Sequence, residues 1–176
     1  MVESKFATPC IRANNRSLIN VTALPSGIGG KVLSHKITQI TANSTRASAT
    51  SFADDLDFGS FTPSTSSSIV LIQGVANFDS GINTYTYYKW IVDGSDFLST
   101  TGTTPIHTHG FYNTGAMNNI CYMPSTIFTS ITNSDGSAIP VKCQGKTSSG
   151  TLSINRCNND SNVGSPSTVI WTEIAT

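Results

Sequence analysis

The chain has 176 residues and a formal net charge of zero, and only 11% of its residues are Asp, Glu, Lys or Arg. Ordinary soluble domains carry about 25% charged residues, and here Ser and Thr, at roughly a quarter of the chain, take their place. The few cations are scattered, which argues against nucleic-acid binding, because that function draws on clustered Lys and Arg. No stretch reaches the ~20 apolar residues that a membrane-spanning helix needs, so we expect no membrane partner.

Residues 1 to 30 carry little strand signal and end in the glycine-rich stretch PSGIGG, which is typical of a linker. Because this segment has too few residues for a core of its own, its apolar side chains should pack on a partner protein. We predict an extended N-terminal attachment arm over residues 1 to 30 and one folded domain over residues 31 to 176. The apolar residues expected to make the partner contact are Ile11, Leu18, Ile19, Val21 and Leu24.

Alternating and β-branched segments dominate the rest of the chain and predict strands, separated by turns rich in Gly, Asn and Ser. A long segment rich in Thr, Gly and Asn, residues 95 to 117, is predicted to be a loop. The pattern predicts an all-β fold, an antiparallel, jelly-roll-like β-sandwich. The predicted strands are residues 31–41, 69–78, 84–92, 119–130, 138–146, 151–157 and 167–175.

Two predicted strands show which side chains should be buried. The strand at 69–78 places apolar residues and one glycine on a single face, because alternate residues of a strand point the same way. The strand at 84–92 places Tyr88, Trp90 and Val92 on one face and Tyr85, Tyr87 and Lys89 on the other. We expect the first of these two faces to be core.

The four cysteines show neither a C-x-x-C pair nor a zinc-site spacing. Buried, reduced thiols are one interpretation, and a bridge between Cys143 and Cys157 across a hairpin is the other. Residues 1 to 10 lack the apolar core of a signal peptide. We therefore expect synthesis in a cytoplasm, where disulfides are disfavoured.

Three segments resemble those of short tailed-phage virion proteins. The run INVTALPSGIGGKVL, at residues 19–33, is similar to segments that lead into a β domain in such proteins. The FTPS sequence that begins at Phe61, followed by a Ser-rich turn and a strand up to Ile72, resembles tail-fibre and head-fibre modules. The final TVIWTEIAT is similar to their closing strand. The chain departs from the pattern at Ser68, where those modules usually carry Lys.

The resemblance implies a virion structural protein, commonly a homotrimer, that is made in the host cytoplasm and acts on the virion surface. In such proteins the N-terminal arm attaches to other capsid or tail proteins and the β domain faces outward. A chain of this length has no room for a fibre shaft, which favours a capsid decoration protein, a head fibre or a small tail-associated protein. We expect the trimer face to include Val169, Trp171 or the strand that begins at Thr84.

A second function, carbohydrate or host-receptor binding during adsorption, would use aromatic side chains, which stack on sugar rings. The candidates are Tyr85 and Tyr87 in the strand and Phe111 and Tyr112 in the predicted loop. The alternative is that aromatic residues in this part of the chain belong to the core or to a trimer interface.

The pair His107 and His109 lies at i and i+2, on one face of an extended segment. In a trimer, six such imidazoles could bind a transition metal on the three-fold axis, and otherwise the two histidines are exposed loop residues. Asp54, Asp55 and Asp57 could likewise hold Ca²⁺ or form a solvated acidic loop. No other cofactor is expected.

No motif for catalysis is present: the sequence lacks G-x-S-x-G, H-E-x-x-H and a phosphate-binding glycine loop. A Ser/His/Asp triad would have to use one of three histidines, and His35 lies in a predicted strand, where a structural role is expected. We predict that the protein is not an enzyme.

Overall fold

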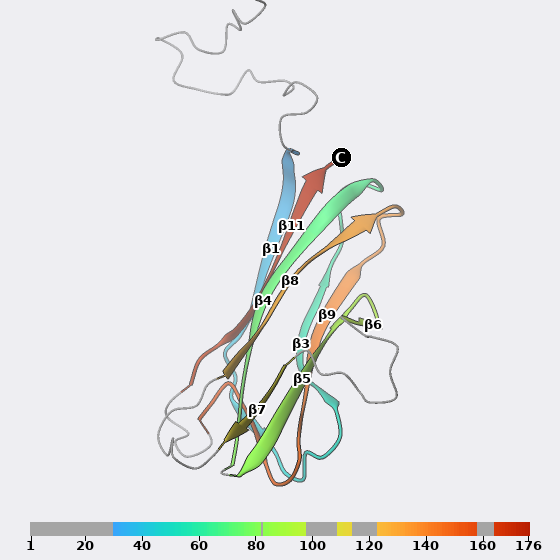
Figure 1. Cartoon of the computed structure of the whole chain (residues 1–176). Helices are drawn as coiled ribbons and strands as arrows, with labels where there is room; N and C mark the ends of the chain where they lie inside the picture. The colour runs from blue at the N-terminus through green and yellow to red at the C-terminus, as the bar shows by residue number, and fades with distance from the viewer. Residues whose placement is uncertain (1–29, 82, 98–108, 114–122, 158–163) are drawn as a thin grey trace, which may run out of the picture. The chain divides into compact units, whose positions relative to one another are not determined.

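The computed structural model describes residues 30–81, 83–97, 109–113, 123–157 and 164–176 (Figure 1). All described strands belong to one compact unit, residues 32–176. Among the described residues, no helix has the length and apolar character that a membrane span requires. The strands are β1 (Val32–Ile40), β2 (Ser44–Arg46), β3 (Ala53–Phe61), β4 (Ser68–Ser80), β5 (Thr84–Val92), β6 (Ser95–Asp96), β7 (His109–Asn113), β8 (Met123–Asn133), β9 (Ile139–Thr147), β10 (Leu152–Ile154) and β11 (Ser167–Ala175).

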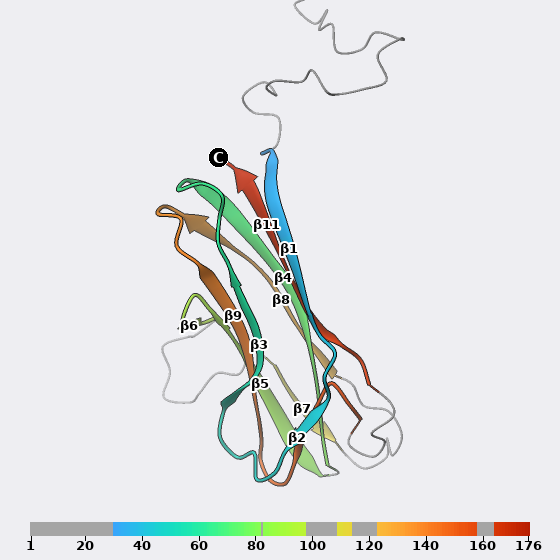
Figure 2. The ribbon, with the colours of Figure 1, turned by 180° about the vertical axis from the view of Figure 1, so that it is seen from behind.

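Two antiparallel sheets face each other, as Figures 1 and 2 show from opposite sides. The first, called the β4 sheet, runs β1–β11–β4–β8, and β10 with β2 continues along β4 beyond the end of β11. The second, called the β5 sheet, runs β3–β9–β5, and β6 and β7 share the far edge of β5. The predicted all-β antiparallel sandwich is confirmed.

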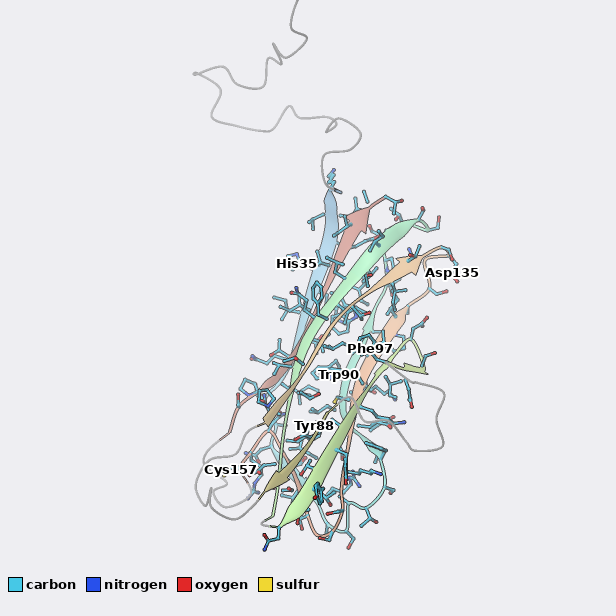
Figure 3. All side chains as sticks on the ribbon, in the orientation of Figure 1. His35, Tyr88, Trp90, Phe97, Asp135 and Cys157 are labelled. Atoms are coloured by element: carbon cyan, nitrogen blue, oxygen red, sulfur yellow. The ribbon has the colours of Figure 1, made fainter. Side chains whose placement is uncertain are left out.

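The core lies between the sheets because each strand alternates inward apolar and outward polar residues. Tyr88, Trp90 and Val92 are buried, as predicted, and Figure 3 labels the first two. The Trp90 ring stacks on Phe58 at 5.8 Å between ring centroids. The β4 sheet contributes Trp171 and Val169, both fully buried. The expectation that these two residues form a trimer face is therefore wrong, because their side chains are fully buried in the core and are not available to a partner.

Two predicted strands, residues 84–92 and 167–175, match the structure at both ends. The turn after β5 is a tight hairpin, in which Asp93 and Gly94 have φ of 52° and 74° as a primed turn requires. The sequence pattern did not predict β3, because its three aspartates interrupt the apolar alternation. It also assigned β7 to a loop, since only pairing with Thr84–Tyr88 of β5 reveals this short strand.

Candidate functional surfaces

The solvent-accessible outer surface of β1, β11, β4 and β8 carries no Asp, Glu, Lys or Arg, because Asp79 of β4 is buried. We call this surface the uncharged face. Its side chains alternate with the buried ones along each strand, and most are Ile, Leu, Val, Thr or Ser. It consists of His35, Ile37, Gln39, Ile69, Leu71, Gln73, Val75, Thr126, Phe128, Ser130, Thr132, Thr168, Ile170, Thr172 and Ile174.

One cross-strand row gives this face its apolar centre. Register pairs Ile37 with Ile170, Ile170 with Gln73, and Gln73 with Phe128. The side chains at the two ends of the row are the most exposed, with 59% of Ile37 and 67% of Phe128 accessible to solvent. A hollow of about 430 Å³ lies beside the row, over β11, β4 and β8, and Val75 lines it. The face therefore offers both protruding apolar side chains and a recess.

The outer surface of the β5 sheet, called the charged face, carries ion pairs between lysines and aspartates. Lys142 Nζ lies 2.7 Å from an Asp54 carboxylate oxygen, and Lys89 Nζ lies 3.1 Å from Asp96. The hydrogen bond that Lys142 donates, joined by one from Gln144, lowers the pKa of Asp54, and the same bond raises the pKa of Lys142. These residues, together with Ile91 and Pro140, line a hollow of about 520 Å³.

Aromatic rings and lysines meet at one part of the charged face. Lys146 Nζ lies 4.8 Å from the Phe52 ring centroid and 5.1 Å from that of Tyr87, and Lys89 Nζ lies 5.2 Å from Phe52. Tyr87 also stacks on Tyr85, which is 48% exposed. We call these five residues the aromatic–lysine patch. Both tyrosines were predicted from the strand pattern, whereas Phe52 was not, because it precedes β3 and reaches the patch only through folding.

Other predicted site residues are only partly placed. Phe111 and Tyr112 lie in β7, with backbones paired to Thr86 and Tyr85, and nothing further is described of their side chains. The backbone of His109 also belongs to β7. The arm residues Ile11, Leu18, Ile19, Val21 and Leu24, together with His107, lie outside the described residues. Their roles in partner and metal binding stay predictions.

The three aspartates of β3 do not converge. Asp54 and Asp57 both face Lys142, whereas Asp55 points to Arg46, which donates to its carboxylate from Nε at 2.8 Å and from Nη2 at 2.9 Å. The Asp55 side chain is only 4% exposed. Each carboxylate thus contacts a protein cation, and no group of three His, Cys, Asp or Glu in the described ranges could hold a metal ion.

The partly buried Arg46–Asp55 pair, in which 26% of the Arg46 side chain is exposed, also contacts the backbone of Gly145. Arg46 Nη2 donates to its carbonyl at 2.7 Å, and its N–H donates to Asp55 at 3.1 Å. A Cβ at this glycine would lie 2.7 Å from Leu152 Cδ2, so only glycine permits the close approach. The pair fixes β2 and the chain after it to the β5 sheet.

A second buried carboxylate, Glu173 on β11, is held by neutral donors. Ser64 donates from Oγ at 2.7 Å and from its backbone N–H at 2.9 Å, and Ser34 Oγ donates at 2.8 Å. The Thr65 N–H donates at 3.2 Å. Burial opposes ionisation, but the bonds from Ser64 and Ser34 outweigh it and lower the pKa of Glu173 to about 2. The Thr-Pro-Ser-Thr run thus forms a cradle that ties the β3–β4 loop to β11.

The two cysteines within the described residues, Cys143 and Cys157, are buried and free, as the first interpretation predicted. Burial raises the pKa of the Cys143 thiol, so it stays protonated at neutral pH and is a poor nucleophile. His35 lies exposed on β1.

No protein-family model and no curated protein sequence matches the chain. Among solved structures, similarity reaches the infectious bursal disease virus Gx strain (13% identity, TM-score 0.36) and the VP2 subviral particle of that virus (12% identity, TM-score 0.34). Each match covers 82% of this chain and 39% of the viral chain, so this chain spans well under half of those proteins. A Bacillus endospore appendage of the disulfide-linked pilus family matches over 88% of this chain and its own full length, with 13% identity and a TM-score of 0.23. Likenesses with such low TM-scores do not decide the function.

Proposed function

We propose that this chain is a virion structural protein whose β-sandwich is displayed on the particle surface. In this proposal residues 1–30 attach it to a capsid or tail protein of a tailed phage, as a decoration protein, head fibre or small tail-associated protein. Its mechanism is binding through buried area, and no catalytic step is assigned to it.

The observation that carries the proposal is the unequal charge of the two outer surfaces. Placing Phe128 and Ile37 at 67% and 59% exposure on a face without charges favours burial against another protein, because free proteins rarely leave large apolar patches in water. The charged face, with Lys89, Lys142 and Asp54 on one sheet, suits the side that stays in water. The sandwich therefore has one side suited to a neighbouring virion protein and one suited to solvent.

Particle binding tests this proposal. Purified protein is added to virions from a strain in which its gene is deleted, and bound copies are counted after sedimentation. We expect binding by the wild type, loss of binding when residues 2–24 are deleted, and at least about tenfold weaker binding of Ile170→Lys. Ile91→Lys is the matched control, since Ile91 is also half-buried but lies on the charged face. Absence of the chain from wild-type virions by mass spectrometry would contradict the proposal.

Carbohydrate binding is the second candidate function, and the aromatic–lysine patch favours it. Exposed tyrosine rings stack on sugars, and the two lysines suit a glycan that carries carboxylates. The neighbouring hollow, lined by Asp54, Gln144 and Lys142, supplies hydrogen-bonding groups. On host surface polysaccharide, Tyr85→Ala should weaken binding about fivefold. Phe128→Ala, which removes an exposed ring from the opposite surface, should not weaken this binding. Equal loss of binding in both variants would contradict the assignment of the glycan site to the aromatic–lysine patch.

A further inference from the structure

The sandwich protects its sheet edges unequally. Natural sheets discourage edge pairing with charges, bulges, short strands or covering elements. Edge strand β1 carries Lys36 and a register shift between Val32 and Ser34, and β3 carries two register shifts and its aspartates. The outer edge of β5 is covered by β6 and β7.

Strand β8 has none of these protections along its centre. It pairs with β4 without a register shift over all eleven of its residues, and no described strand pairs with its other edge. Its sequence, MPSTIFTSITN, contains no charge, and its one proline, Pro124, is its second residue. β8 lies in front of β4 in Figure 1 and behind it in Figure 2, at the border of the sheet.

The sequence of β8 is also self-complementary. Phe128 is the middle residue of the strand and is 67% exposed. An antiparallel pair of β8 strands related by a two-fold axis at Phe128 would set the two phenylalanine rings side by side, as cross-strand aromatic pairs prefer. It would also set Thr126 opposite Ser130 and Ser125 opposite Ile131. No like charges meet, and Pro124 stays outside the paired stretch.

We infer that β8 is a docking edge for a second copy of this chain, joined by antiparallel pairing of Ser125–Ile131 with the same residues of its partner. The result is one continuous sheet with the uncharged face of both copies on the same side. Seven paired strand residues extend about 24 Å and the two-layer edge is about 10 Å deep, so the contact covers roughly 500 Å² in total, below the range of stable specific interfaces. The dimer is therefore reversible and forms as concentration rises.

Analytical ultracentrifugation of the full chain at increasing concentration tests this inference. We expect the wild type to approach twice its chain mass of 18.6 kDa. Phe128→Lys should weaken association about tenfold or more, because two ammonium groups then face each other. Ile37→Lys, at a similarly exposed site on β1, should associate like the wild type. Mixing Phe128→Lys with Phe128→Glu should restore dimers, which shows that Phe128→Lys remains folded.

Cysteine pairs test the register in a chain with Cys10→Ser and Cys121→Ser. In the proposed register, Thr126 of one copy lies opposite Ser130 of the other, and opposed residues have Cα atoms about 5 Å apart, within disulfide range. The two copies of Thr126 are offset by four residues, about 13 Å along the strand, which is too far for a disulfide. Thr126→Cys and Ser130→Cys should cross-link when mixed and neither should cross-link alone.

Three outcomes overturn the inference: a monomer throughout, a closed trimer, or association sensitive to Ile37→Lys and not to Phe128→Lys. None of them bears on particle binding, so this inference and the proposed function fail separately. A trimer, which the sequence resemblance implies, stays a prediction that the same mass measurement decides.

Discussion

The two sheets of the sandwich share one core but differ in how they hold their shielded carboxylates and in the charge of their outer surfaces. Both bury apolar residues against each other, and each has a shielded carboxylate that anchors a neighbouring segment. The β5 sheet contributes Asp55, which pairs with the Arg46 guanidinium of β2, and it spreads lysines and aspartates over its outer surface. The β4 sheet holds Glu173 with hydroxyl and backbone N–H groups, and the described side chains of its uncharged face include no Asp, Glu, Lys or Arg.

This difference separates two roles. Charges on the β5 sheet keep its surface hydrated, since each exposed ion pair remains partly solvated. The uncharged face loses little solvation when another protein covers it, because the unfavourable desolvation of ions does not arise there. A protein that must dock on one side and remain in water on the other requires such a division. The following predictions test it, beginning with the largest expected effect.

Arg46→Ala should be the most destabilising change, lowering the free energy of unfolding by about 3–5 kcal/mol. The substitution leaves the Asp55 carboxylate, only 4% exposed, without its cation. Urea denaturation followed by tryptophan fluorescence measures the loss. The double variant Arg46→Ala/Asp55→Asn should recover part of the stability, and a double variant no more stable than Arg46→Ala would show that packing, not charge, dominates.

Glu173→Gln should cost less at pH 7, about 1–3 kcal/mol, because an amide still fills the cradle but loses charge-assisted hydrogen bonds. A glutamine also has an NH2 group in place of one carboxylate oxygen. If this group lies where Oε2 accepts from the Ser64 N–H and hydroxyl, donor faces donor and those hydrogen bonds are lost. Urea denaturation again measures the change. An effect as large as that of Arg46→Ala would mean that neutral donors and a guanidinium are equivalent partners for a buried carboxylate.

The stabilising contribution of Glu173 should depend on pH in a defined window. Its folded pKa of about 2 lies below the ordinary 4.5, so the unfolded chain takes up the proton first as the pH falls. The contribution is complete above pH 4.5 and is lost as the pH drops from 4.5 towards 2. Urea midpoints of wild type and Glu173→Gln should therefore converge over that range. A constant difference between the two would contradict the assigned pKa.

Lys89→Ala should have the smallest effect, below about 1 kcal/mol, because its partner Asp96 is 44% exposed and water screens the pair. Thermal unfolding at low and at 0.5 M salt should show a difference at low salt that shrinks at high salt. A salt-independent loss would point instead to the contact between Lys89 and the Phe52 ring.

Local sequence patterns identified most of the architecture. Alternation located β5 and β11 to the residue and separated buried Tyr88, Trp90 and Val92 from outward Tyr85 and Tyr87, because a strand has a period of two wherever one of its faces is buried. The same alternation did not predict β3, because its aspartates form ion pairs with cations of other strands, and a local pattern does not reveal those cations. The resemblance drew attention to the Thr-Pro-Ser-Thr run without revealing its structural role.

The sequence by itself determined that the chain is an antiparallel β-sandwich and which side of its main strands is core. Only the tertiary structure decided that Val169 and Trp171 are core and not interface, that Glu173 organises the Ser-rich loop, and that no described strand pairs with the outer edge of β8. The physical reason is that alternation along a strand tells inside from outside, whereas charge partners, cross-strand rows and edges depend on which strands lie side by side.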